Sequence, residues 1–159
     1  MIKSSVKKAT IKDIKFLFNL YNSSIIERIS NTKKKIRFNS HKKWFYENIN
    51  SKLNKIFILF YGKLKIGYIR IKIFKKKSCI ISIYIKKTYR NKNLGSLYLN
   101  KIFKIIRNKE GINKIYAEVL KKNISSQSFF LRNDFKLTKL KKNNVSTLNN
   151  KNHIYLKII

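Results

Sequence analysis

Residues 89–103, YRNKNLGSLYLNKIF, combine a cation, two asparagines and a glycine with the start of an apolar stripe. The apolar side chains recur at the spacing of one helix face, which predicts a helix from about Leu94. They are Leu94, Leu97, Tyr98, Ile102 and Phe103. A helix that opens on glycine and small polar residues presents free backbone N–H groups at the positive end of its dipole, which suits a phosphate group. An ordinary turn between a strand and a helix would use the same residues, so this stretch alone leaves both interpretations open.

Two further side chains, His41 and Glu118, have the chemistry of a general base. His41 titrates near neutral pH, because an unperturbed imidazole has a pKa of about 6.5. It shares a helix face with Trp44 and Phe45, and that spacing is also typical of packing, while a helix-capping role for His41 remains open as well. Glu118 is expected on a strand, where its carboxylate can act as a base or pair with a cation. The sequence predicts no metal site, because no metal-ligand cluster is present.

The elements that must position these residues alternate between strands and helices. Thr10 and Asp13 have the spacing of a capping box ahead of a helix over 11–22, and Ser40 is expected to cap a helix over 41–50. Two later helices and seven short strands follow from the hydrophobic periodicity. The helices are expected over 94–107 and 125–133, and the strands over 5–10, 54–62, 63–74, 79–87, 112–120, 135–140 and 153–159.

This order of elements predicts an α+β fold in a single domain over residues 1–159. Gly62 and Lys63 indicate a hairpin turn between two of the strands. We therefore expect a mixed, mostly antiparallel sheet of about six to seven strands flanked by about four helices.

The charge of the chain is strongly unbalanced, with 39 Lys and Arg residues against 6 Asp and Glu and a formal net charge of +33. Such a charge ordinarily indicates a nucleic acid or an anionic membrane surface as partner. The lysines are spread over the whole chain, Pro is absent and Ala occurs only at positions 9 and 117, which indicates a bias toward A/T-rich codons. We therefore expect attraction of anionic ligands, but neither a nucleic acid nor a membrane as partner.

Cysteine content and hydropathy predict the compartment. Cys79 is the single cysteine, so the chain forms no internal disulfide and fits a reducing compartment. The apolar runs are far shorter than the roughly 20 residues of a membrane helix. The first residues also lack the hydrophobic core of a signal peptide. The sequence therefore predicts a cytoplasmic protein, which we expect to be a monomer or a homodimer.

Two segments carry a resemblance to a known family. Residues 81–103, ISIYIKKTYRNKNLGSLYLNKIF, resemble motif A of the GNAT superfamily of acetyl-CoA-dependent N-acetyltransferases, and residues 112–135 are similar to its second signature. The resemblance implies acetyl-CoA as co-substrate, with its pyrophosphate wrapped by backbone amides and its thioester held by the backbone of Ile83 and Ile85. Gly95 is then expected because a side chain would block the approach of the coenzyme. The coenzyme-binding residues so implied are Ile83, Ile85, Arg90, Asn91, Lys92, Asn93, Leu94, Gly95, Ser96, Asn123, Ser126 and Phe130.

The chain departs from the family pattern at three positions. Asn93 and Asp134 stand where the family has glycine, and both residue types tolerate the left-handed backbone region. Phe130 stands where the family often has a Tyr that protonates the departing thiol. A bound water or unaided release of the thiolate would then serve instead. The alternative is a degenerate member that binds the coenzyme without catalysis.

The acceptor is indicated by residues 28–45, which are similar to the acetyltransferases of pseudaminic and legionaminic acid biosynthesis. This resemblance implies transfer of the acetyl group to the primary amine of a UDP-linked deoxyamino sugar. Tyr84 is expected to face that acceptor, because it points to the opposite side of its strand from Ile83 and Ile85. The substrate-binding residues so implied are Arg28, His41, Trp44 and Tyr84, and the candidate catalytic residues are His41, Tyr84 and Glu118.

Two other functions remain open at this point. A protein or ribosomal-protein N-terminus could replace the sugar as acceptor, which the basic surface would favour. A basic nucleic-acid-binding protein without catalysis is the third possibility, because an aromatic content of 13% allows base stacking. The absence of a concentrated basic motif in the sequence argues against it.

Overall fold

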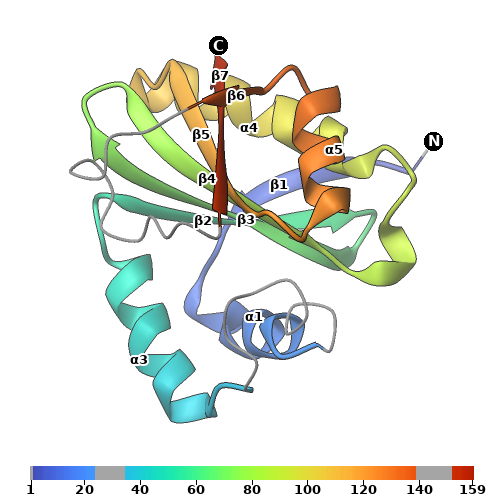
Figure 1. Cartoon of the computed structure of the whole chain (residues 1–159). Helices are drawn as coiled ribbons and strands as arrows, with labels where there is room; N and C mark the ends of the chain where they lie inside the picture. Colours follow the sequence, from blue (N-terminus) through green and yellow to red (C-terminus); the bar gives the residue numbers. More distant parts are fainter. Residues whose placement is uncertain (1, 24–34, 139–151) are drawn as a thin grey trace.

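A single twisted sheet with helices on both faces forms the framework of the computed structural model, which describes residues 2–23, 35–138 and 152–159 (Figure 1). The strands are β1 (Ser4–Lys8), β2 (Asn54–Tyr61), β3 (Leu64–Lys75), β4 (Ser78–Ile85), β5 (Lys114–Leu120), β6 (Lys136–Thr138) and β7 (Asn152–Ile158). The helices are α1 (Ile14–Tyr21), α3 (Phe38–Ile49), α4 (Leu94–Glu110) and α5 (Ile124–Arg132), with short 3-10 turns at Ile11–Asp13 and Lys87–Tyr89.

The seven described strands lie in the order β1-β2-β3-β4-β5-β7-β6. Every neighbouring pair runs antiparallel except β4 and β5, which run parallel. The predicted α+β fold with a mixed, mostly antiparallel sheet is therefore confirmed. Gly62 lies between β2 and β3 with φ of 61°, as the hairpin turn expected there requires.

The parallel pairing of β4 and β5 is short. It includes Ser78 with Lys114, Cys79 with Ile115 and Ile80 with Tyr116, and it ends there. Beyond Ile80, β4 stays paired with β3 as far as Ile85, whereas β5 stays paired with β7 as far as Leu120. The sheet therefore splits into two halves that separate toward the lower edge in Figure 1.

Each face of the sheet has its own apolar core. Helix α4 covers one face with Tyr98, Leu99 and Ile102, which pack with residues such as Ile71 and Ile81 from the strands. The Tyr98 hydroxyl donates a hydrogen bond to the Phe60 backbone oxygen at 2.7 Å, so this buried polar group is satisfied.

The predicted stripe of α4 is largely confirmed, with one exception. Leu97 is 41% exposed, whereas Leu99, which the predicted stripe left out, is buried in the core.

Helices α1 and α3 cover part of the other face, below the sheet in Figure 1. The capping box expected ahead of α1 is present, because the Thr10 backbone N–H donates to Asp13 Oδ2 at 2.7 Å. Asp13 also forms an ion pair of 2.7 Å with Lys65. These contacts fix the entry of the chain into α1.

The expectation that Ser40 caps the next helix is wrong. Helix α3 begins at Phe38, after an extended Arg37, and Ser40 lies in its first turn. The Phe38 ring packs edge-on against Phe18 of α1, with ring centroids 5.1 Å apart. This apolar contact extends the helix two residues beyond the polar signal in the sequence.

Candidate active site

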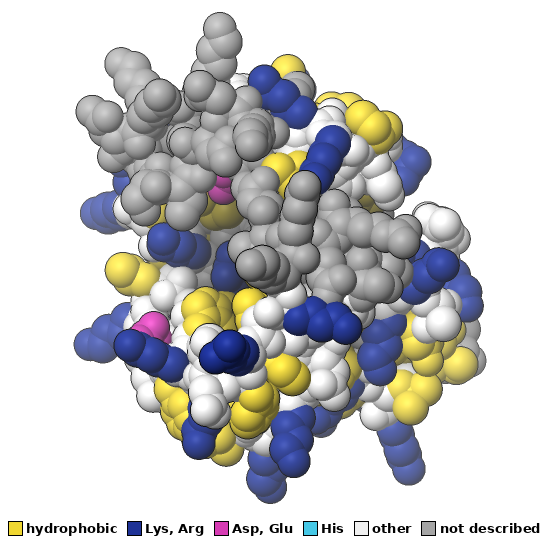
Figure 2. All heavy atoms as spheres, turned by 60° about the horizontal axis from the view of Figure 1, so that its bottom comes forward, with side chains coloured by type: hydrophobic (Ala, Val, Ile, Leu, Met, Phe, Trp, Pro, Cys, Tyr) yellow, Lys and Arg dark blue, Asp and Glu magenta, His cyan; other side chains and the backbone are white. Residues whose placement is uncertain are grey.

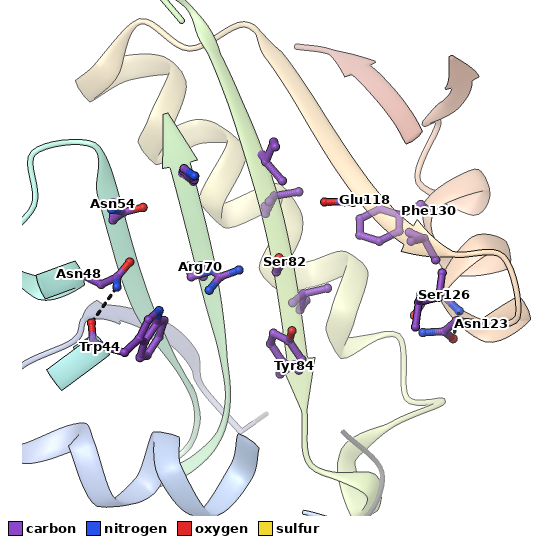
Figure 3. Close-up of a pocket in the computed structure, with 16 residues that line it drawn as sticks. Trp44, Asn48, Asn54, Arg70, Ser82, Tyr84, Glu118, Asn123, Ser126 and Phe130 are labelled. Atoms are coloured by element: carbon purple, nitrogen blue, oxygen red, sulfur yellow. Dashed lines mark hydrogen bonds between the residues drawn. The ribbon is translucent and has the colours of Figure 1, made fainter. Parts of the chain in front are cut away.

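Two adjoining cavities follow the line along which β4 and β5 separate. The large cavity, of about 450 Å³, lies over the diverging ends of these strands and reaches across β3 to α3 (Figure 3). The small cavity, of about 210 Å³, lies between the end of β4, the beginning of α4 and α5. The two cavities share Ile83, Tyr84, Asn123 and Ser126, so they meet at the end of β4.

The small cavity is built on the beginning of α4. Asn91 and Asn93 both have left-handed backbone conformations, with φ of 56° and 55°. The first helical hydrogen bond runs from the Leu97 N–H to the Asn93 oxygen at 3.2 Å, so the N–H groups of Leu94, Gly95 and Ser96 precede it. The helix dipole and these amides suit an anionic group in the cavity.

Most residues expected to hold the coenzyme pyrophosphate line this small cavity. They are Arg90, Asn91, Asn93, Leu94, Gly95 and Ser96. Lys92 does not line it, and its ammonium lies instead 5.8 Å from the centre of the Tyr89 ring. The loop therefore brings the predicted set together with one exception.

Arg90 connects this loop to the sheet. Its Nε donates a hydrogen bond of 2.9 Å to the Ile85 backbone oxygen, at the end of β4. Burial lowers the pKa of the Arg90 guanidinium, but arginine remains a cation at any physiological pH. The Arg90 side chain thus contributes positive charge to the small cavity and fixes the spacing of loop and strand.

Gly95 has a packing role that sequence reasoning missed. A Cβ atom at this position would lie 2.7 Å from Cε2 of Phe129 on α5. The absence of a side chain therefore lets the Phe129 ring lie against the first turn of α4. Phe129 also lines the small cavity, so this contact shapes the cavity wall.

The backbone of β4 faces the split in the sheet. Successive N–H and C=O groups of a strand point alternately toward its two neighbours. The Lys86 N–H donates to the Ile66 oxygen at 2.8 Å, so Lys86 directs its backbone groups toward β3. Ile85 and Ile83 lie one and three residues earlier, so their backbone N–H and C=O groups point away from β3. Because β5 has diverged there, the Ile83 backbone N–H and C=O face the cavities, while the Ile83 and Ile85 side chains pack against the α4 core.

Tyr84 lies where the two cavities meet. Its side chain points to the opposite face from Ile83, and its ring stacks on Tyr68 with centroids 4.7 Å apart. Burial raises the pKa of the Tyr84 hydroxyl, and this effect exceeds the opposing effect of Arg70. Tyr84 is therefore a neutral hydrogen-bond donor at physiological pH.

Helix α5 contributes Asn123 and Ser126 to both cavities. Asn123 caps this helix, because its side-chain oxygen accepts the Ser126 N–H at 3.1 Å. Phe130 is only 5% exposed, packs on Phe135 at 5.0 Å between centroids and lines the large cavity rather than the small one. Phe130 is thus an apolar wall of the site.

Charged residues of the large cavity come from β3 and β5. Arg70 and Lys72 lie on β3, and Glu118 lies on β5, across the gap in the sheet (Figure 3). Trp44 lines the same cavity, and the Arg70 guanidinium lies 5.7 Å from the centre of its ring. Glu118 has an interaction partner of its own within the protein.

Sequence reasoning did not single out Arg70 and Lys72. A signal was present in the strand alternation, because Ile69, Ile71 and Ile73 point to one face and the residues between them must point to the other. The core contacts confirm that alternation for Ile69 and Ile71, which are buried under α4.

His41 lies in the packing between α1 and α3. It is 2% exposed, its ring contacts Phe18, Trp44 and Phe45, and it lines neither cavity. Neither of its ring nitrogens has a hydrogen-bond partner of normal geometry within the described residues. Burial lowers the pKa of the imidazole, and the Ile14 backbone opposes this only in part.

Arg28 lies outside the described residues. In the described part of the chain, no three or more His, Cys, Asp or Glu side chains converge as metal ligands would. Among the helices in the same ranges, none has the length and hydropathy of a membrane span.

A split sheet whose gap leads into a helix N-terminus has room and backbone N–H groups for an extended anionic ligand. The chain belongs to the acetyltransferase (GNAT) family, whose model matches residues 17–135.

Comparisons with individual proteins find a curated sequence relative and solved structures with the same fold. The chain is 32% identical over 102 residues to the spermidine N(1)-acetyltransferase of Thermoplasma acidophilum, a match that spans 62% of each protein. A domain from Methanocaldococcus jannaschii has 20% identity and a TM-score of 0.83, with both chains covered completely. The Campylobacter jejuni N-acetyltransferase PseH has 18% identity and a TM-score of 0.71, over 98% of this chain and 97% of that one.

Proposed function

We propose that this protein transfers the acetyl group of acetyl-CoA to a primary amine. The observation that carries the proposal is the meeting of the two cavities at Ile83 and Tyr84, where β4 is paired with β3 on one side and is no longer paired with β5 on the other. The small cavity offers amides and cations for the coenzyme phosphates, and the large cavity leaves room for an acceptor. A thioester placed between them would lie within reach of both.

The reaction needs polarisation of the thioester carbonyl, close approach of a neutral amine and removal of one proton. The Ile83 backbone N–H is the donor that we assign to the carbonyl or to the adjoining part of the coenzyme. Attack forms the new C–N bond and breaks the C–S bond. The amine then gives up one proton, and the departing thiolate takes one.

Glu118 and Tyr84 are the titratable side chains, apart from the two cations, that line the large cavity in the described residues. We assign proton removal to Glu118 through a water molecule and protonation of the thiolate to Tyr84, which burial keeps neutral. We do not assign a proton transfer to His41, because it lines neither cavity. Phe130 has no proton to donate.

The acceptor that we propose is the amine of a UDP-linked deoxyamino sugar, on the likeness to PseH and the sequence of residues 28–45. The N-terminus of a protein remains an alternative acceptor for the same chemistry. A polyamine is the second candidate, because the curated relative is a spermidine acetyltransferase. The charge of the large cavity distinguishes between these candidates.

The first prediction is that acetyl-CoA binds and stabilises the fold. A ligand that binds only the native state raises the free energy of unfolding by about 2.7 kcal/mol at 100 times its dissociation constant, which thermal melting detects. Calorimetry should then give a dissociation constant, and an assay for free thiol should show release of CoA only with an amine present.

The controls separate binding from catalysis. Glu118→Gln and Tyr84→Phe should bind acetyl-CoA like the parent and lower kcat by about 10²- to 10⁴-fold if they transfer protons. Absence of acetyl-CoA binding at millimolar concentration would remove the proposal. Binding without turnover on any amine would leave a coenzyme-binding protein without catalysis.

A further inference from the structure

We infer that the acceptor carries an oxyanion, a phosphate or a carboxylate, and that Arg70 and Lys72 bind it. This inference rests on the proposed function and narrows its substrate class. It follows from the position of the two cations in the sheet, from their lack of acidic partners and from the type of residue present.

The register of the sheet places the two cations on one face. Arg70 is paired with Ser82 of β4, and Lys72 is paired with Asn54 of β2 and Ile80 of β4. Side chains at neighbouring alternate positions of a strand point to the same face. Both cations thus line the large cavity, Arg70 opposite the part of β4 that has separated from β5 (Figure 3) and Lys72 opposite the last β4 residue paired with β5.

No ion pair found among the described residues includes Arg70 or Lys72. The ion pairs in that part of the chain join Lys55 with Glu110, Lys65 with Asp13 and Lys157 with Asp134. Arg70 instead lies over the face of Trp44, which fixes the guanidinium while leaving its N–H groups available. The planar guanidinium held in this way can donate two parallel hydrogen bonds to two oxygens of one phosphate or carboxylate.

Compositional bias does not account for Arg70. Six of the 39 cationic residues are arginine, and the other 33 are lysine. Three of these six arginines line the cavities: Arg70 lines the large cavity, and Arg90 and Arg132 line the small one. A bias that merely adds surface cations would place lysine there, so the concentration of arginine at the cavities indicates recognition of oxyanions.

A polyamine fits this cavity poorly. Its ammonium groups would meet two cations and a single carboxylate, Glu118, which already has a partner. Like charges a few ångströms apart repel, and partial burial strengthens the repulsion. The relative's substrate therefore does not transfer to this chain, whereas an amine that also carries an oxyanion is attracted.

The experiment compares acceptors in pairs, in which one member carries a phosphate or carboxylate that the other lacks. A UDP-linked 4-amino-4,6-dideoxyhexose is paired with its methyl glycoside, γ-aminobutyrate is paired with butylamine, and spermidine is the polycation. The variants are Arg70→Gln, Arg70→Lys and Lys72→Gln in the full chain. Lys75→Gln is the matched control, because Lys75 is an exposed cation on the same strand that lines neither cavity.

We expect the parent to have a kcat/KM at least tenfold higher for the anionic member of one pair. The pair that shows this identifies phosphate or carboxylate as the anion. Arg70→Gln and Lys72→Gln should each lower that value about tenfold or more, mainly through KM, and change the neutral member less than threefold. Arg70→Lys should recover only part of the loss, and Lys75→Gln should match the parent.

Equal kcat/KM for charged and neutral members, a preference for spermidine, or an equal loss in Lys75→Gln would overturn the inference. A second measurement keeps it testable if no acceptor is acetylated. Binding of pyrophosphate and of succinate to the CoA-saturated protein should be at least tenfold weaker in Arg70→Gln, whose folding is checked by its melting temperature. Equal binding in parent and variant, or no binding of either probe, would overturn the anion site independently of catalysis.

Discussion

Asparagine and aspartate hold two backbone positions of this chain in conformations that glycine adopts more readily. Asn93 has φ of 55° at the beginning of α4, and Asp134 has φ of 63° ahead of Phe135. Asp134 also pairs with Lys157 at 3.0 Å, so the polar side chain gains a contact that glycine would lack. The backbone path thus persists without glycine, at the cost of a side chain near the small cavity at Asn93.

His41 gives a prediction at this scale. His41→Phe should leave kcat within threefold of the parent, because the ring lies in apolar packing and lines neither cavity. Removal of two buried nitrogens without a hydrogen-bond partner among the described residues should also raise the free energy of unfolding by about 1 kcal/mol. Steady-state kinetics and chemical denaturation are the measurements.

The stability gain should depend on pH with a definite sign. Burial lowers the pKa of His41 below its ordinary value of 6.5, so below pH 6.5 the unfolded chain takes up a proton more readily than the folded protein. The parent therefore loses stability as the pH falls through this range, and the advantage of His41→Phe should be larger at pH 5 than at pH 8. If the variant instead turned over about a hundredfold more slowly than the parent, His41 would have a role in proton transfer.

The sequence predicted local backbone conformations better than it predicted where individual side chains lie in the fold. The left-handed turns at Asn93 and Asp134 follow from local backbone sterics, and the sequence contains that information. The burial of His41 depends on how α3 packs against α1, which a local spacing does not specify. Arg70 was missed because it resembles any other cation in a chain with 39 of them.

The contact between α4 and α5 is the critical element contact at the small cavity. Gly95 lets Phe129 approach the first turn of α4, and Phe129 packs in turn edge-on against Phe130 at 5.2 Å between centroids. The position of α5 therefore depends on one missing side chain in α4. This packing holds the beginning of α5, which Asn123 caps, close to the backbone N–H groups at the beginning of α4.

Gly95→Ala should weaken acetyl-CoA binding about tenfold, because the new methyl group displaces the Phe129 ring into the small cavity. The double variant Gly95→Ala with Phe129→Leu should recover affinity to within threefold, since leucine leaves room for the methyl group. Phe129→Leu alone is the control, and calorimetry is the measurement. If the double variant binds as weakly as Gly95→Ala, Gly95 contacts the coenzyme itself.

Most elements were predictable because each has its own hydrophobic period and turn residues. The order of strands and helices and their approximate bounds agree with the structure. The split between β4 and β5 was not predictable, because each strand has an ordinary pattern and the separation arises from their different partners, β3 and β7. The cavities exist only because of that split, so the sequence indicated the small cavity through its loop and missed the shape of the large one.

The positive side chains are distributed rather than gathered on the face of the molecule that Figure 2 shows. Figure 2 shows Lys and Arg side chains scattered over the described surface of one face, with hydrophobic side chains between them. This view agrees with the expectation of a spread positive surface without a basic track. A general positive field raises the local concentration of anions such as coenzyme and acceptor, and the arginines at the cavities then select among them.

The three residue pairs that join β4 to β5 also make the sheet mechanically discontinuous. We expect the strands up to β4 and those from β5 onward to behave as two stiff units, with this short pairing as a hinge between them. An extended ligand lying along the Ile83 backbone would contact both sides of the gap and restrict their relative motion. Amide hydrogen exchange should then slow in residues 81–85 and 117–120 when acetyl-CoA is added, with no change in α3. Slowing restricted to residues 91–96 would mean that the ligand touches only the loop and the hinge stays free.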